Sequence, residues 1–186
     1  MWKKIECAVI ACVLCLVGAA VTAAAESSTA AKEMAKPERI ELVLVLDKSG
    51  SMQGLESDTI GGFNSMIEKQ KELAIPVRVT AVLFNDEMDV LYAHKDIRYV
   101  RPLTAKEYEV GGTTALLDAV GNTILRVARE PAVTREGTKV IFVIITDGLE
   151  NASTEFSKEK IKEMISDKQE MEGWDFIYLG ANIDAV

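Results

Sequence analysis

Short apolar runs alternate along this chain with longer stretches in which apolar residues recur every three or four positions. Apolar runs of four to eight residues are typical of buried strands, and the three-to-four recurrence is typical of amphipathic helices. The pattern predicts strands at 40–46, 77–84, 88–94, 140–145 and 174–179, and helices at 59–73, 115–129 and 158–171. Because strands alternate with helices, the sequence predicts an α/β fold with a mainly parallel sheet covered on both faces.

Two segments refine this topology. The run 140–145 is almost entirely β-branched, which is typical of a central strand buried on both faces. Asn85 and Asp86 form a turn-favouring pair between the strands predicted at 77–84 and 88–94. We therefore expect these two strands to pair antiparallel, at an edge of the sheet.

The first 25 residues have the pattern of a secretory signal peptide. Two lysines precede an uncharged apolar run, 7–25, which ends in three alanines before Glu26. The run is also long enough for an uncleaved membrane anchor. Either interpretation predicts an extracytoplasmic protein (secreted, periplasmic or membrane-anchored). If the segment is neither a signal peptide nor a membrane anchor, a cytoplasmic location is expected. Residues 26–38 are predicted to form a flexible linker, followed by one folded domain at 39–186.

Composition narrows the function classes. The chain of 186 residues has 29 Asp and Glu against 21 Lys and Arg, a formal charge of -8, which disfavours nucleic-acid binding. All three cysteines, Cys7, Cys12 and Cys15, lie in the N-terminal apolar run, so the predicted domain has no disulfide and no thiolate metal ligand. The single histidine, His94, ends a predicted edge strand, and we interpret it as a surface residue and not as a general base or zinc ligand.

Three loops carry oxygen-bearing side chains toward one edge of the predicted sheet. Asp-Lys-Ser-Gly-Ser (47–51) follows the first strand, Gly-Gly-Thr (111–113) leads into a helix, and Thr-Asp-Gly (146–148) follows the strand at 140–145. Carboxyl ends of parallel strands meet at one edge, and oxygen ligands are those that Mg²⁺ prefers. The sequence thus predicts a magnesium-type site, whose residues are Asp47, Ser49, Ser51, Thr113 and Asp147.

The three motifs together resemble the metal-ion-dependent adhesion site of von Willebrand factor A domains. The resemblance covers roughly residues 39–186, and it implies a Rossmann-like, doubly wound sheet with helices on both faces. Family members usually continue beyond the last predicted strand into a final helix. A chain that stops at Val186 is therefore expected to lack that helix, to leave an apolar face of its outer strand uncovered, and to be marginally stable or to pair there with another chain.

The resemblance also implies how the residues would act. The hydroxyls of Ser49, Ser51 and Thr113 are expected to ligate Mg²⁺ or Mn²⁺, with Thr114 as the alternative to Thr113. Asp47 and Asp147 are expected to act largely through water. Neutral hydroxyl ligands leave the metal electrophilic, with one position open to an acidic side chain of a partner protein. The predicted function is a metal-dependent protein-binding module and not an enzyme, with membrane contact only through an uncleaved N-terminal segment.

Other functions fit the sequence less well. The same fold serves as an accessory subunit of larger assemblies, such as chaperone-like ATPase complexes, and this alternative applies if the N-terminal segment is not an export signal. A magnesium-dependent phosphotransferase needs a second aspartate where this chain has Ser49. A calcium loop needs glycine where this chain has Met52. The chain has neither a P-loop nor a serine-hydrolase motif.

Two further groups of residues are expected to stabilise the fold and not to bind a ligand. Glu150 and Asn151 are expected to cap the segment that follows them instead of selecting a partner. Trp174, Phe176 and Tyr178 alternate along the last predicted strand, which is typical of aromatic packing in the core.

Overall fold

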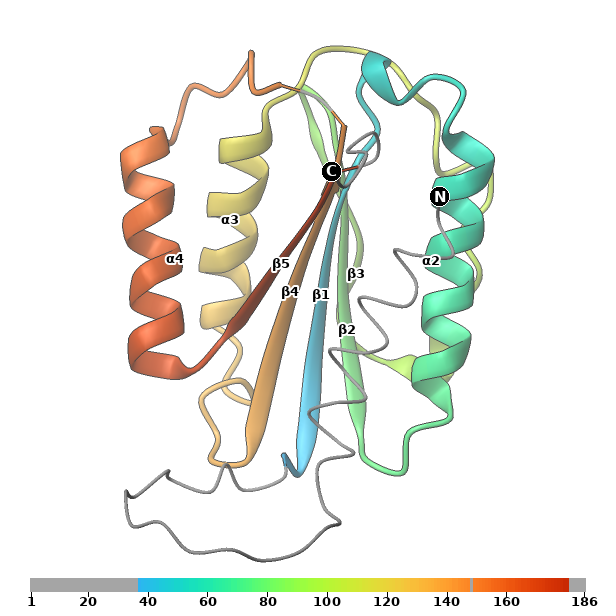
Figure 1. Ribbon diagram of the computed structural model, residues 1–186. Helices are drawn as coiled ribbons and strands as arrows, with labels where there is room; N and C mark the ends of the chain where they lie inside the picture. Colours follow the sequence, from blue (N-terminus) through green and yellow to red (C-terminus); the bar gives the residue numbers. More distant parts are fainter. Residues whose placement is uncertain (1–36, 148, 181–186) are drawn as a thin grey trace, which may run out of the picture.

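The computed structural model describes residues 37–147 and 149–180 (Figure 1). The predicted signal peptide and most of the predicted linker lie outside these ranges, as do the last six residues of the chain. None of the helices within the described ranges combines the length and apolar character needed to cross a membrane.

Within the described residues, five strands form one sheet in the order β3-β2-β1-β4-β5. The strands are β1 (Arg39–Asp47), β2 (Val77–Phe84), β3 (Met88–Asp96), β4 (Thr138–Thr146) and β5 (Asp175–Gly180). β1 pairs in parallel with β2 and β4, and β4 pairs in parallel with β5. β3 runs antiparallel to β2 at the edge. Both the mainly parallel sheet and its antiparallel edge pair are confirmed.

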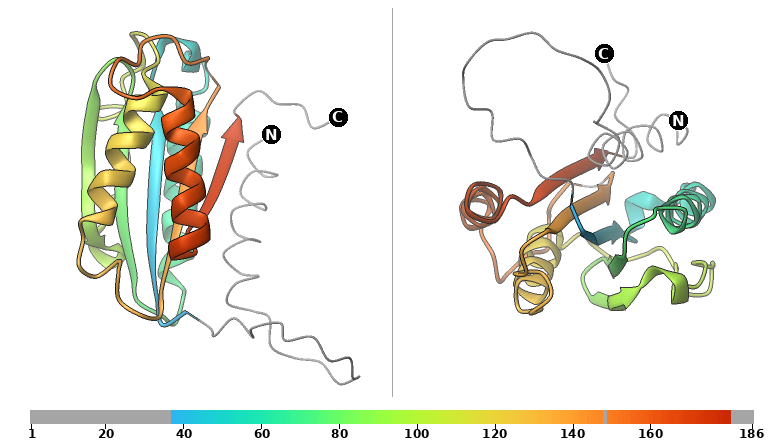
Figure 2. Two further views of the ribbon diagram at one scale, coloured as in Figure 1. Left: turned by 90° about the vertical axis from the view of Figure 1, so that its left-hand side faces the viewer. Right: turned by 90° about the horizontal axis from the view of Figure 1, so that it is seen from below.

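Helices cover both faces of this sheet, as the doubly wound prediction requires. α2 (Glu56–Lys71) lies on one face, and α3 (Leu116–Ala128) and α4 (Lys158–Glu172) lie on the other (Figures 1 and 2). Two short 3-10 turns, η1 (Gly50–Met52) and η2 (Ile97–Tyr99), complete the described elements. The expectation of a missing final helix concerns residues beyond the described ranges.

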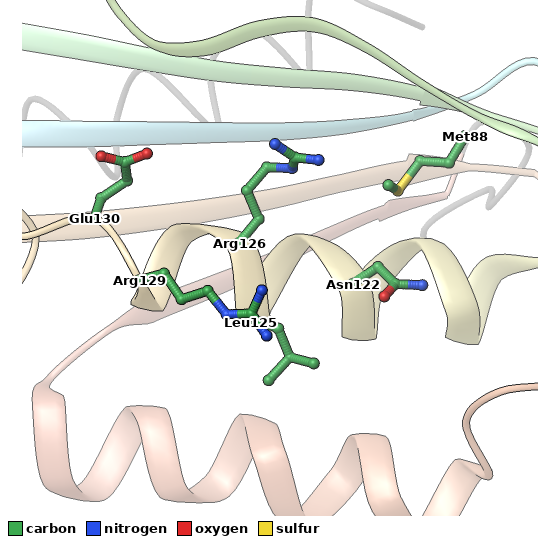
Figure 3. A pocket seen from close by; sticks show the side chains of 6 residues that line it. All are labelled: Met88, Asn122, Leu125, Arg126, Arg129 and Glu130. Carbon is green, nitrogen blue, oxygen red and sulfur yellow. The ribbon is translucent and has the colours of Figure 1, made fainter.

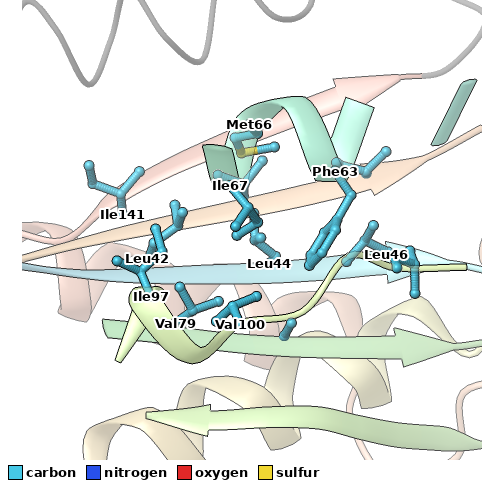
Figure 4. Close-up of a cluster of buried hydrophobic side chains, with 14 of the residues drawn as sticks. Leu42, Leu44, Leu46, Phe63, Met66, Ile67, Val79, Ile97, Val100 and Ile141 are labelled. Carbon is cyan, nitrogen blue, oxygen red and sulfur yellow. The ribbon is translucent and has the colours of Figure 1, made fainter. Parts of the chain in front are cut away.

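β1 divides the core into two apolar clusters because successive side chains of a strand point to opposite faces. One cluster joins the even-numbered residues of β1 to apolar side chains of α2 (Figure 4). The other joins Val43 and Val45 to α3 and α4. β1 and β4 lie at the centre, and the β-branched run from Val140 to Ile145 is buried, as predicted.

The helix boundaries differ from the predicted ones. α2 begins at Glu56, three residues before the predicted start. The sequence pattern missed this first turn because it is polar and carries no apolar periodicity. The Glu56 carboxylate accepts the N–H of Gly54 (2.8 Å), which holds this polar first turn against the preceding loop.

The strand order places the predicted site at the switch point of the sheet. From β1 the chain passes through α2 to β2 and β3 on one side, and later through α3 to β4 and β5 on the other. In such sheets a crevice opens at the carboxyl ends of the strands where the order changes direction. Here those ends belong to β1 and β4, and the residues there are Asp47 and Thr146.

Candidate metal centre

Asp47 is the anchor of the candidate centre. Its side chain is fully buried at the end of β1, and both carboxylate oxygens are engaged. Oδ1 accepts the N–H of Ser49 (2.7 Å), and Oδ2 accepts the hydroxyl of Thr146. The Asp47 carbonyl oxygen accepts the hydroxyl of the buried Tyr108. These contacts fix the direction in which the chain leaves β1.

Ser49, Ser51 and Asp147 form a chain of hydrogen-bonded oxygens that runs from the buried Ser49 to the exposed Ser51 and the half-buried Asp147. The two serine Oγ atoms lie 3.1 Å apart, and Ser51 Oγ donates to Asp147 Oδ1 at 2.8 Å. Adjacent ligands of an octahedral Mg²⁺ ion, each about 2.1 Å from the metal, lie about 3 Å apart. The spacing of these three oxygens therefore suits neighbouring positions around one such ion.

Thr113 reaches the same place through the backbone of its loop. The N–H of Gly111 donates to the carbonyl of Lys48 (2.9 Å), and the N–H of Gly50 donates to the carbonyl of Gly112 (3.1 Å). Thr113 is exposed beside this junction, whereas Thr114 is buried. Of the two threonines, Thr113 thus has the side chain at the surface.

The β2–β3 turn holds the threonine loop from both ends, a role that the sequence did not predict. Asn85 donates from Nδ2 to the carbonyl of Gly111 (2.9 Å), and its own carbonyl accepts the N–H of Ala115 (2.8 Å). Asp86 Oδ1 lies 3.3 Å from the N–H nitrogen of Thr113. The turn that we predicted only as a hairpin connection also positions Thr113.

Gly112 has two reasons to be glycine. Its φ of +77° lies in the left-handed region, which side chains with a Cβ rarely adopt. A Cβ at this position would also lie 2.0 Å from Asp86 Oδ1. The close approach of the β2–β3 turn to this loop therefore depends on glycine.

Glu150 and Asn151 hold the loop that carries Asp147. Asn151 Oδ1 accepts the N–H of Thr114 (2.9 Å), and Glu150 Oε2 accepts the N–H of Leu117 at the start of α3 (2.9 Å). Glu150 also accepts hydrogen bonds from the segment that follows it, from Ala152 N, Ser153 N and Ser153 Oγ. The expected capping of the following segment is therefore present. The bonds to Thr114, just before α3, and to Leu117, at its start, were not predicted.

Asp118 provides a second lock from the first turn of α3. Its carboxylate accepts three consecutive backbone N–H groups of the β4–α4 loop, at 2.7 to 2.9 Å, from Thr154, Glu155 and Phe156. Helix α3 therefore fixes both the threonine loop that leads into it and the aspartate loop that follows β4.

The comparisons with known proteins agree with this architecture. The family model of the von Willebrand factor type A domain matches residues 41–182. The chain belongs to this family. A comparison with curated protein sequences gives no match.

Solved structures of the same fold share little sequence with this von Willebrand factor A domain. The manganese-loaded TRAP protein of Plasmodium vivax is 21% identical, with a TM-score of 0.58 over 79% of this chain and 59% of that one. Proximal thread matrix protein 1 of the mussel byssus is 18% identical, with a TM-score of 0.54 over 77% of this chain and 36% of that one. A von Willebrand factor type A protein of Catenulispora acidiphila is 18% identical, with a TM-score of 0.51 over 77% of this chain and 32% of that one. The chain thus spans less than two thirds of each of these structures.

Charges around the centre of this domain are mainly negative. Lys48, between Asp47 and Ser49, directs its ammonium to Asp89 (Nζ to Oδ2, 2.7 Å). Burial raises the pKa of the Tyr108 phenol, and the charges of Asp47 and Asp147 raise it further, so Tyr108 remains a proton donor at neutral pH. Within the described residues no three His, Cys, Asp or Glu side chains form a metal cluster.

His94 lies in the edge strand β3, near the end of the sheet opposite the candidate centre, and it is only partly exposed at the surface. Its side chain is 24% exposed, and its Nδ1 lies 2.6 Å from Oε2 of Glu41, a carboxylate buried in β1 that also accepts the hydroxyl of Thr80 (2.9 Å). Burial raises the pKa of Glu41. Glu41 precedes Asp47 by six residues of extended strand, roughly 20 Å, so His94 is remote from the candidate centre.

A groove of about 320 Å³ also lies away from the centre, between α3 and the start of β3 (Figure 3). It is lined by Met88, Asn122, Leu125, Arg126, Arg129 and Glu130. None of the five predicted site residues lines it.

Proposed function

We propose that this von Willebrand factor A domain is a divalent-metal-dependent protein-binding module. Mg²⁺ or Mn²⁺ is held by Ser49, Ser51 and Thr113, with Asp47 and Asp147 acting largely through water, and an acidic side chain of a partner protein completes the coordination. The observation that carries this proposal is the chain of oxygens from Ser49 through Ser51 to Asp147, spaced at 3.1 and 2.8 Å.

The chemistry of the donor set supports a cation over an anion. Two carboxylates lie at the crevice, and the nearby ammonium of Lys48 is turned to Asp89. Uncharged hydroxyls in the inner shell leave most of the charge of the metal uncompensated, so it retains affinity for an external carboxylate. The manganese loaded into the TRAP structure gives a precedent for a divalent metal in the same fold.

Binding, and not catalysis, suits the residues at the centre. The single histidine of the chain is paired with Glu41 near the other edge of the sheet. The position of a phosphotransferase's second aspartate is occupied by Ser49, whose backbone N–H is bonded to Asp47. The metal in this proposal therefore bridges two proteins and does not activate a nucleophile.

Binding of Mn²⁺ to the full-length chain, followed by electron paramagnetic resonance, tests the metal centre. One tightly bound ion per chain is expected. Ser51→Ala removes an exposed hydroxyl and should weaken Mn²⁺ binding at least about tenfold. Ser157→Ala is the matched control, because Ser157 caps α4 by accepting the N–H of Lys160 and makes no contact with the centre. Equal Mn²⁺ affinity in wild type and Ser51→Ala would refute the assignment.

Affinity capture tests the bridge to a partner. A partner retained by the wild-type chain in Mg²⁺ should be released by a chelator and retained again when Mg²⁺ is restored. Asp47→Ala should behave like the chelated protein. Capture that persists undiminished in chelator would contradict a metal bridge.

We also propose that residues 1–25 direct export, so that the domain acts outside the cytoplasm. A mature chain beginning at Glu26 is the expected product of signal cleavage. N-terminal sequencing of the protein from fractionated cells measures this directly. A soluble cytoplasmic chain with an intact N-terminus would contradict export.

A further inference from the structure

Two large apolar side chains are exposed in segments near the carboxyl ends of β4 and β5. Leu149, two residues after Asp147, is 87% exposed. Tyr178 is 54% exposed near the end of β5, where it pairs in register with Ile144 of β4. Core packing was expected for Tyr178, and that expectation was wrong: Trp174 and Phe176 stack against each other, whereas Tyr178 lies largely in solvent.

Both apolar side chains belong to the neighbourhood of Asp147. Leu149 follows Asp147 by two positions, a span of at most about 7.6 Å between their Cα atoms. Tyr178 pairs with Ile144, two residues before Thr146 at the end of β4, so it lies near the carboxyl end of the sheet where the candidate centre is. Tyr178 shares the sheet face of Phe176, which is the face covered by α3 and α4.

The rim of the candidate centre is acidic at the β2–β3 turn. Asp86 and Glu87 are exposed in the β2–β3 turn, and Asp86 contacts the backbone of Thr113. A partner that approached with a cluster of carboxylates would meet repulsion from this turn. The rim therefore favours a partner that brings one carboxylate to the metal and an uncharged, apolar group beside it.

We propose that the partner presents its metal-binding carboxylate next to a large apolar side chain, which packs on Leu149 and Tyr178. Exposed apolar side chains are common singly on protein surfaces, but interface hot spots are apolar or aromatic anchors at the centre of a contact. Here two such side chains lie in segments at the carboxyl ends of β4 and β5, the end of the sheet at which a partner ligand is expected. This inference rests on the proposed metal-dependent binding and adds the chemistry of the partner segment.

Two short peptides test the inference on the full-length, Mn²⁺-loaded chain. One is acetyl-Gly-Asp-Leu-Gly-amide, and the other has serine in place of leucine. Displacement of Mn²⁺-bound water, measured by water-proton relaxation, reports how each peptide binds. The leucine peptide should bind wild type about tenfold more tightly, a difference of 1.4 kcal/mol.

Two variants identify the surface responsible. Leu149→Ser should abolish the preference for the leucine peptide while leaving Mn²⁺ affinity and the binding of the serine peptide unchanged. Met171→Ser is the matched control, because Met171 is 83% exposed near the end of α4, and it should retain the preference.

The outcomes separate this inference from the proposed function. Equal binding of the two peptides to the Mn²⁺-loaded chain, or no displacement of water by either, would overturn the inference and leave the metal centre intact. A preference that survives Leu149→Ser would overturn the assigned surface. Failure of the chain to bind Mn²⁺ would overturn the proposed function and this inference together.

Discussion

Glu150→Gln is a sensitive test of how the loop carrying Asp147 is held. The carboxylate of Glu150 accepts four hydrogen bonds, from three backbone N–H groups and one hydroxyl, at 2.7 to 2.9 Å. Two of them reach each carboxylate oxygen. Glutamine has nearly the same shape but only one acceptor oxygen. If that oxygen keeps the N–H groups of Ala152 and Ser153, the amide faces the Ser153 hydroxyl, which can accept from it, and the N–H of Leu117, whose bond is lost.

The expected loss of stability is about 2 kcal/mol. A hydrogen bond to a charged group contributes about 1.5 to 3 kcal/mol, and the substitution removes one such bond and leaves the others with a neutral acceptor or donor. Urea unfolding at pH 7, followed by circular dichroism, measures the free energy of unfolding. Mn²⁺ affinity should also fall, because the same loop positions Asp147.

Glu155→Gln is the matched control. Glu155 lies in the same loop and accepts one side-chain bond, from Nδ2 of Asn122 (2.8 Å). The same substitution there should change the free energy of unfolding by no more than about 0.5 kcal/mol. Equal losses in the two variants would refute the claim that Glu150 is the residue that locks this loop.

The pH dependence gives an independent check on Glu150. Partial burial acts to raise the pKa of its carboxyl, but the hydrogen bonds outweigh burial and lower the pKa below its ordinary value of 4.5. A depressed pKa gives stability that is present above the unfolded-state pKa and is lost as the pH falls through the folded-state pKa. The difference in stability between wild type and Glu150→Gln should therefore narrow as the pH falls below about 4.5. A constant difference down to pH 3 would contradict this.

Two further substitutions test the surroundings of the centre. Gly112→Ala should destabilise the domain by about 2 kcal/mol in thermal unfolding, because Gly112 has a positive φ and Asp86 lies close to it. Gly61→Ala is the control: Gly61 lies in α2 with open space beside it, and the substitution should stabilise the domain by about 0.5 to 1 kcal/mol. Stabilisation by both substitutions would contradict the assignment. Tyr108→Phe should cost about 1 to 3 kcal/mol in urea unfolding, because it leaves the buried carbonyl of Asp47 without its donor; an unchanged midpoint would show that this bond is dispensable.

The strands could be predicted from the sequence because their signal is local. The predicted strand 77–84 coincides with β2, and the run 140–145 lies inside β4 at the centre of the sheet. Asn85 and Asp86 also placed the antiparallel edge pair correctly. Helix ends were less accurate, since a polar first turn such as that of α2 is set by contacts with the preceding loop and not by apolar spacing.

The predicted site residues came from three motifs. Asp47, Ser49, Ser51 and Asp147 follow the two central strands and are joined by hydrogen bonds, whereas Thr113 belongs to the loop before α3, which meets the first motif through its backbone. The residues that hold them in place were missed. Tyr108, Asn85 and Asp118 act on segments 61, 26 and 36 or more residues away in the chain, respectively. No local pattern encodes such distances, because each bond depends on how loops meet at the sheet edge.

Glu41 and His94 show which part of the missing information the sequence did contain. Glu41 occupies an inward position in an otherwise apolar strand, where a carboxylate is costly without a partner. That cost predicts a buried hydrogen-bond donor but not its identity. The antiparallel return of β3, with its irregular register against β2, brings His94 to within 2.6 Å. The same reasoning applies at the other end of β1, where the buried carboxylate of Asp47 required donors and the fold supplied the N–H of Ser49 and the hydroxyl of Thr146. Tyr108 donates to the backbone carbonyl of the same residue. A buried acid in a predicted central strand therefore locates a polar junction of the fold, and only the assembled loops decide which donors meet it there.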